Sequence, residues 1–216
     1  MKVVSSPKRM GMVAGLCLGL LLAGGSLSGA RAALSPVPEN SVQNFYATLL
    51  LTMKSGPRLG ESGRYAQLAP IVQQLFDVPY MAQLAVGPSW ASLGPVQQQQ
   101  IISAFGHYIA ATYADRFDSY SGEQLQVLGE QPLSYGTLVQ TRIIQSDGKP
   151  VTINYLMRPN GGTWQITDIY LDGTISQLAT QRSEFTSILR DRGVAGLIET
   201  LNRKVDLLTR DASSSS

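Results

Sequence analysis

The sequence predicts an α+β fold in which helices cover a curved antiparallel sheet of about four strands. From about residue 123 to residue 171, apolar residues alternate with polar ones, which is the period of a half-buried strand. Before and after this region they recur every three or four positions, which is the period of an amphipathic helix. A meander of strands between two helical regions is typical of the α+β class.

The first 32 residues are typical of a cleaved secretory signal peptide. Basic residues precede an apolar stretch from Met10 to about Leu22, and the small residues around Arg31 fit cleavage after Ala32. Glycines interrupt the stretch and it is short for a membrane span, so a retained anchor is the less favoured alternative. Cys17, the only cysteine, lies inside the stretch and not at its end, where a lipoprotein carries its lipid. We expect an exported chain without cysteine or lipid anchor.

Residues 33–210 are expected to form one domain, and residues 211–216 a disordered tail. Without the four basic residues of the signal peptide, 13 of the 17 basic side chains remain against 15 acidic ones. This balance leaves no basic patch for a nucleic acid. Because no disulfide is possible, the stability of the exported chain must come from a well-developed apolar core.

Helices are expected wherever apolar residues at helical spacing lie between capping residues, prolines or glycines. The longest, near residues 95–117, begins at a proline and carries a broad aromatic and aliphatic face. The loop at residues 54–57 is expected to end the first helix. The predicted helical segments are about 40–53, a stretch from about 64 to 76 that Pro70 divides, 79–85, 95–117, 174–190 and 194–208.

Four strands are expected near residues 125–127, 139–143, 151–157 and 164–170. Short turns with glycine at Asp147-Gly148 and at residues 160–162 separate the last three strands. These three should therefore be antiparallel neighbours. Gly173 is expected to end the sheet, and the helical aromatic residues are expected to face it.

The residues that catalysis or metal binding ordinarily needs are scarce. The only histidine, His107, lies on a helix that is mainly packing surface, and there is no G-x-S-x-G motif for a nucleophilic serine. One histidine and no mature cysteine are too few for zinc, and no loop has the spacing of a calcium or phosphate site. We expect no catalytic residue, metal or cofactor, and interpret His107 as structural or partly exposed.

Asp168 is open to two interpretations. Alternation places it on the same side of its strand as Ile166 and Tyr170, where an ionised carboxylate needs hydrogen-bond partners. It is either a proton-abstracting base in an apolar pocket, or a structural carboxylate that accepts hydrogen bonds from the backbone, Arg142 or Arg182. We favour the structural role, because no second polar residue that would complete a catalytic pair is evident.

Several segments of the chain, taken in order, resemble a known family. They are RYAQLAPIVQQLFDVPYMAQLAVGPSW, AFGHYIAATYADRF, VTINYLMR and the stretch that begins WQITDIYLDG and continues to residue 201. Together they are similar to the periplasmic lipid-binding proteins of the MlaC (toluene-tolerance) family, over residues 41–208. The segment FDVPYM, the strand with YLMR and the helix with RSEF look most like the hopanoid-associated branch called HpnM.

The resemblance implies a cone like that of nuclear transport factor 2, in which a curved antiparallel sheet and helices enclose a deep apolar pocket. It also implies a periplasmic carrier that holds the acyl chains of a phospholipid or a hopanoid. The implied partners are an inner-membrane ABC transporter complex and an outer-membrane complex of lipoprotein and porin. No nucleic acid is implied. A small isomerase or lyase that uses Asp168 as its base, and an adaptor without a cavity, are the alternatives.

The lining of the expected cavity is predicted from periodicity alone. The head group should stay near the cavity mouth, where release into a partner is possible. The predicted lipid-binding side chains are those of the inward strand face and of the apolar helix faces: Met81, Leu84, Phe105, Ile109, Val139, Ile143, Ile153, Tyr155, Met157, Ile166, Tyr170, Ile175, Leu178 and Leu189.

Overall fold

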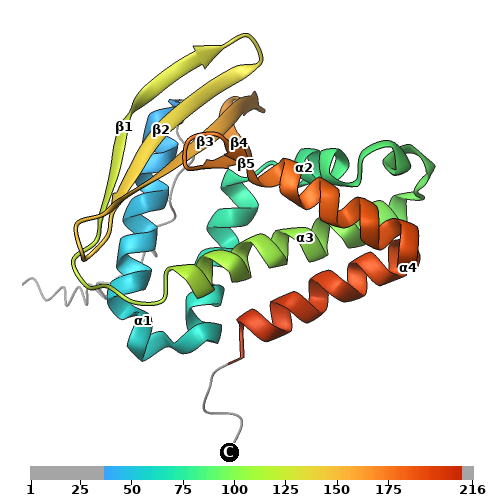
Figure 1. The fold of residues 1–216 in the computed structure, drawn as a ribbon, viewed down its shortest axis with the longest axis horizontal. Coiled ribbons are helices and arrows are strands. Elements are labelled where there is room, and N and C mark those ends of the chain that lie inside the picture. The colour runs from blue at the N-terminus through green and yellow to red at the C-terminus, as the bar shows by residue number, and fades with distance from the viewer. Residues whose placement is uncertain (1–36, 211–216) are drawn as a thin grey trace, which may run out of the picture. The chain divides into compact units, whose positions relative to one another are not determined.

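The computed structural model describes residues 37–210, so the predicted signal peptide and tail lie outside the described residues. The described elements follow the predicted order and confirm the α+β class (Figure 1). No helix among them is long and apolar enough to span a bilayer. The elements are α1 Pro38–Leu75, α2 Val78–Val86, the 3-10 helix η1 Gly87–Ser92, α3 Pro95–Arg116, β1 Gln124–Leu133, β2 Gly136–Ile144, β3 Pro150–Asn160, β4 Thr163–Leu171, β5 Ile175–Ser176 and α4 Gln177–Leu208.

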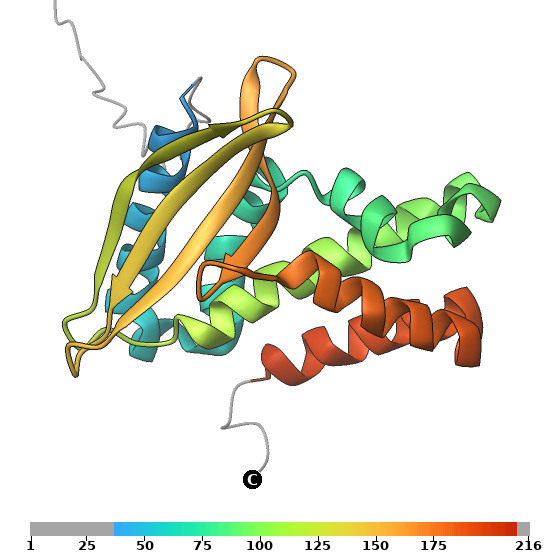
Figure 2. The ribbon, with the colours of Figure 1, turned by 45° about the horizontal axis from the view of Figure 1, so that its top comes forward.

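The sheet is an antiparallel meander in the order β1-β2-β3-β4-β5, which confirms the predicted pairing of neighbouring strands. The fifth strand follows Gly173, where the sheet was expected to end. Two residues are too few to show a period, so this strand was missed. The pairing register shifts once between β1 and β2 and once between β3 and β4, and such bulges increase the twist of a sheet. The sheet is accordingly curved (Figure 2).

The first helix is longer than predicted, because residues 54–57 do not end it. The helical path breaks instead at Gly60, whose φ of 64° favours glycine. The buried guanidinium of Arg64 lies beside this kink, where its Nε donates to the carbonyl of Ala114 at 2.8 Å and a second nitrogen to that of Gly56 at 3.4 Å. These carbonyls belong to the last turns of two helical segments, where a cation is favoured. Arg64 thus stabilises the bend that sequence periodicity could not indicate.

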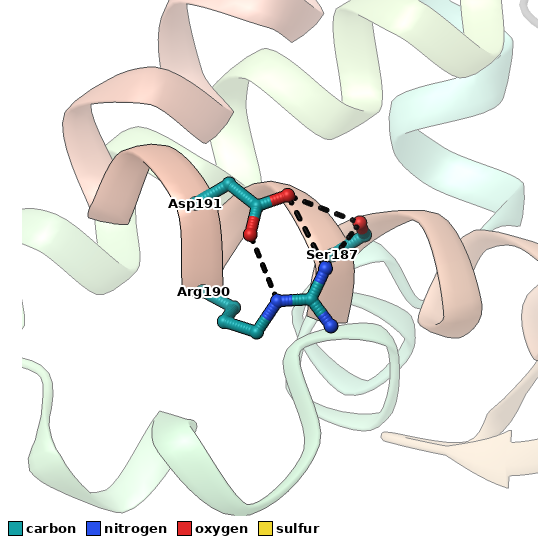
Figure 3. Close-up of polar contacts among 3 residues, drawn as sticks. All are labelled: Ser187, Arg190 and Asp191. Carbon is teal, nitrogen blue, oxygen red and sulfur yellow. Dashed lines mark hydrogen bonds and ion pairs between the residues drawn. The ribbon is translucent and has the colours of Figure 1, made fainter.

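Helix α4 consists of two segments that meet at Gly193, with φ of 66°, and the second segment folds back along the first (Figure 1). This confirms the two predicted C-terminal helices, with the first beginning at Gln177 rather than at residue 174. Lys204 Nζ of the second segment forms an ion pair with Glu184 Oε1 of the first segment, at 2.5 Å. An exposed network also lies near the bend: Arg190 donates to Asp191 at 2.8 Å and to Ser187 at 3.2 Å (Figure 3).

The helices form two groups. Helix α1 runs along one face of the sheet, whereas α2, α3 and α4 contact one another beside the β4–β5 edge (Figures 1 and 2). Between α1 and the sheet lies an aromatic cluster, in which Phe45 and Tyr46 meet the ring of Tyr155 with centroids 6.3 Å and 6.0 Å away. The cluster confirms that helical aromatic residues face the sheet. The same face of the sheet continues towards α3 and α4, and a site can form there.

Candidate functional site

A partly open cavity of about 130 Å³ lies where β3 and β4 meet helices α2, α3 and α4. Most of its wall is apolar, and its polar side chains come from the end of α3, from β4 and from the start of α4. Its lining consists of Met81, Phe105, Tyr108, Ile109, Thr112, Tyr113, Arg116, Phe117, Ile153, Asp168, Ile169, Leu171, Gln177, Leu178 and Gln181.

Helix α3 supplies the longest side of the cavity. Phe105, Ile109, Thr112 and Arg116 follow one another at spacings of three and four, which places them on one stripe of the helix. The stripe changes from aromatic at its buried end to a cation at its exposed end. The cavity therefore has an apolar interior and a charged residue where α3 ends.

A bulge in β4 decides which of its side chains reach the cavity. Leu156 pairs with Asp168 and Met157 with Ile166, which leaves Thr167 as the extra residue. Beyond the bulge, Ile169 and Leu171 enter the lining, while Tyr170 pairs with Asn154 on the other face. The prediction that Ile166 and Tyr170 share one face was therefore wrong, because simple alternation does not include a bulge.

Asp168 has the structural role that was favoured. It is 7% exposed, and its Oδ1 accepts from the backbone N–H of Ile169 at 2.7 Å and of Leu178 at 3.0 Å. Its Oδ2 accepts from the hydroxyl of Ser176 at 2.6 Å, and Ser176 in turn caps the first turn of α4. A carboxylate at a helix N-terminus is favoured by the helix dipole. Asp168 thus fastens α4 to β4, and both of its oxygens are engaged, which argues against a proton-abstracting base.

The predicted arginine partners of Asp168 lie elsewhere. Arg142 is exposed on β2, and the guanidinium of Arg182 lies close to Gly87, where a Cβ would meet its Nε at 3.3 Å. His107 is half-buried and its ring packs edge-on to Tyr65, with centroids 6.4 Å apart, which fits the structural interpretation. Among residues 37–210, no three His, Cys, Asp or Glu side chains gather as metal ligands would.

Tyr113 lies between the cavity and the aromatic cluster and contacts both. Its ring lies 5.1 Å from that of Phe45 and 5.7 Å from that of Phe117, and its hydroxyl donates to Tyr155 at 3.5 Å. Burial raises the pKa of Tyr113 and that of Tyr155. Both phenols therefore stay neutral, and neither places a negative charge beside an acyl chain.

Five of the fourteen predicted lipid-binding residues line the cavity, and nine lie outside it. The five are Met81, Phe105, Ile109, Ile153 and Leu178. Those outside have three kinds of surroundings. Val139, Ile143, Tyr155, Met157 and Ile166 are buried in the molecule, Leu84, Leu189 and Tyr170 are partly buried, and Ile175 is 53% exposed.

Most of the lining residues that periodicity did not assign fall into three groups. Tyr108, Tyr113 and Phe117 belong to the apolar face predicted for α3, and that face alone contained the signal that could have found them. Ile169 and Leu171 were hidden by the bulge. The polar side chains Arg116, Gln177 and Gln181 were missed because an apolar cavity was sought in apolar residues only.

Two comparisons bear on this geometry. The family model described as "MlaC protein" matches residues 43–203, which is well over half of the chain. A phospholipid-binding protein from Ralstonia solanacearum, solved in complex with a phospholipid, has a similar structure with a TM-score of 0.67. The two chains are 23% identical, and the match covers 80% of this chain and 98% of that one. This structural likeness confirms the predicted fold.

Proposed function

We propose, from the premise that this chain belongs to the MlaC family, that it is a lipid carrier which holds acyl chain in the cavity between the sheet and helices α3 and α4. The observation that carries the proposal is the position of the cavity. It lies against the apolar stripe of α3 and the inward residues of β3 and β4, and its polar side chains come from α3, β4 and α4. The solved structure with a similar fold is of a phospholipid-binding protein, which supports the same class of ligand.

A carrier is needed wherever a lipid crosses water. Exposure of an acyl chain costs about 0.8 kcal/mol per methylene, so a two-chain lipid leaves a membrane unaided only at a very low rate. Side chains such as Phe105, Ile109 and Leu178 can replace the membrane as the surroundings of the chain. Hydrogen bonding is not needed along an acyl chain, which agrees with a wall that is mostly apolar.

The cavity must widen to hold a whole lipid. Its volume of about 130 Å³ is below the roughly 300–1,000 Å³ of cavities that enclose drug-sized ligands. The first segment of α4 is the wall that we propose moves. Its hydrogen bonds to the sheet are made at Asp168, and otherwise it packs on α2 and α3 through side chains such as Phe185, whose ring lies 5.2 Å from that of Phe105. We therefore include in the proposal that this segment moves away from α3 when lipid enters.

The place of action and the partners are part of the proposal. The predicted signal peptide and the family favour the periplasm. There the carrier would exchange lipid with an inner-membrane ABC transporter complex and with an outer-membrane complex of lipoprotein and porin. A phospholipid is the ligand that the similar solved structure supports, and a hopanoid is the alternative that the resemblance to HpnM adds. The proposal is a binding and transport role without catalysis.

Native mass spectrometry tests the function. The mature protein is purified from its own periplasm without detergent, weighed intact, and then extracted with organic solvent so that the bound molecule is identified. The expected result is one phospholipid or hopanoid per chain. A folded chain that carries no lipid, and takes none from vesicles, would contradict the proposal.

A further inference from the structure

The polar atoms of the cavity wall differ in whether the protein already satisfies them. Thr112 donates its hydroxyl to the carbonyl of Tyr108 at 2.8 Å, and Gln177 donates its amide to the carbonyl of Ile175 at 3.4 Å. Asp168 accepts three hydrogen bonds. None of these three residues has a buried side-chain polar atom without a partner.

Gln181 is different. Its side-chain oxygen, Oε1, is buried and has no hydrogen-bond partner within residues 37–210. Such an atom is rare in folded proteins, because burying a polar atom without a partner costs free energy that a partner restores. Gln181 lines the cavity one turn after Gln177, on the segment of α4 that faces α3. An acceptor kept in this position is suited to a donor that arrives with the ligand.

The charges around the cavity add a second requirement. Arg116 lines the cavity at the end of α3, is exposed, and makes no ion pair with any described residue. An anion is therefore favoured near Arg116, and an N–H or O–H donor is favoured near Gln181.

We infer that the cavity selects lipids whose head group carries a hydrogen-bond donor next to its phosphate. Arg116 pairs with the phosphate, and Gln181 Oε1 accepts from an ammonium or a hydroxyl of the head group. This inference rests on the proposed function and names the part of the lipid that the site distinguishes. Phosphatidylethanolamine and phosphatidylglycerol have such a donor. Phosphatidylcholine, with three methyl groups on its nitrogen, has none.

The test is a competition among these three lipids with identical acyl chains. Delipidated protein is incubated with vesicles that contain equal amounts of the three, and the bound lipid is measured by native mass spectrometry. The wild type is expected to prefer each donor lipid over phosphatidylcholine by roughly fivefold to tenfold, the value of one hydrogen bond to an otherwise unsatisfied acceptor. Equal uptake of all three would overturn the inference while leaving the carrier function standing. Uptake of none would overturn both.

Two substitutions of Gln181 and one control test whether Gln181 Oε1 causes the preference. Gln181→Met keeps the length of the side chain but removes the acceptor, and it is expected to bring the preference to about one. Gln99→Met, on the exposed surface of α3 outside the cavity, is the matched control and is expected to keep the preference. Gln181→Glu retains an acceptor and should keep the preference for phosphatidylethanolamine over phosphatidylcholine. A preference that survives in Gln181→Met, or is lost in Gln181→Glu, would contradict the role of Gln181.

Discussion

Two regions on the same face of the sheet use similar residues in different ways. Between α1 and the sheet, aromatic rings meet edge to face: Phe45 lies 5.8 Å from Phe76 and 6.3 Å from Tyr155, and all three are at most 1% exposed. Towards α3 and α4, the same kinds of side chain enclose a cavity of about 130 Å³. The difference does not come from hydrophobicity. The two regions differ in the elements that cover them: α1 covers the first, whereas β4, α3 and the start of α4 surround the second.

The packed region supports the open one. Tyr113 belongs to both, since its ring packs against Phe45 and Phe76 and also lines the cavity. We expect the packed aromatic cluster behind Tyr113 to keep this wall of the cavity fixed when α4 moves. Substitutions in the packed region should therefore lower stability, whereas substitutions at the cavity should weaken lipid binding.

The largest effect is expected in the packed region. Phe45→Ala removes a side chain that is 0% exposed and leaves a void among four aromatic rings. It should lower the free energy of unfolding by about 3–5 kcal/mol. Urea denaturation followed by circular dichroism measures this loss. A loss below about 1 kcal/mol would mean that this region is not the rigid support that the comparison requires.

The anchor of α4 should come next. Asp168→Ala leaves the N–H of Leu178 and the hydroxyl of Ser176 without their acceptor, and should lower the free energy of unfolding by about 2 kcal/mol. Hydrogen exchange should show that residues 177–192 open more readily, with α1 unchanged. Asp206→Ala, on the exposed surface of α4, is the control. If the two variants had the same free energy of unfolding and the same hydrogen exchange, Asp168 would not be the residue that anchors α4.

An effect on binding with little effect on folding is expected at the cavity. Ile169→Phe fills space that the lipid should occupy, and overpacking of the bound state should weaken lipid binding by roughly tenfold. Leu189→Phe enlarges a partly buried residue of α4 outside the cavity and should leave affinity within about twofold of wild type. Lipid transfer from fluorescent vesicles gives both affinities. If Leu189→Phe weakened lipid binding more than Ile169→Phe did, the lipid would lie outside this cavity.

The smallest effect is expected at the network of Ser187, Arg190 and Asp191 (Figure 3). The hydrogen bonds from Arg190 hold the pKa of Asp191 below its usual range, so any stability from this pair is present at neutral pH and lost as the pH falls through that lowered pKa. Both groups are exposed, and water screens their attraction. Asp191→Asn should therefore change neither the melting temperature nor lipid binding. A clear change in either would show that the α4 bend takes part in loading.

Sequence periodicity predicted the class, the order of the elements and the antiparallel pairing, because each depends on local patterns of apolar residues. It missed what depends on tertiary contacts. The helix passes residues 54–57 because Arg64 and the close approach of Gly56 to Asp118 hold the bend at Gly60. For the site, the stripe on α3 was foreseeable from the sequence, whereas Ile169 required knowledge of the bulge and Gln181 required an account of buried polar atoms.

We propose that the acyl chain lies between the sheet and helices α3 and α4, and not between the sheet and α1. Photocrosslinking tests it most directly: the protein is loaded with a phospholipid that carries a diazirine near the end of one acyl chain, irradiated, digested and mapped by mass spectrometry. We predict adducts on the apolar cavity residues of α2 and α3, at Met81, Phe105 and Ile109. Adducts confined to Phe45, Val139 and their neighbours would contradict it.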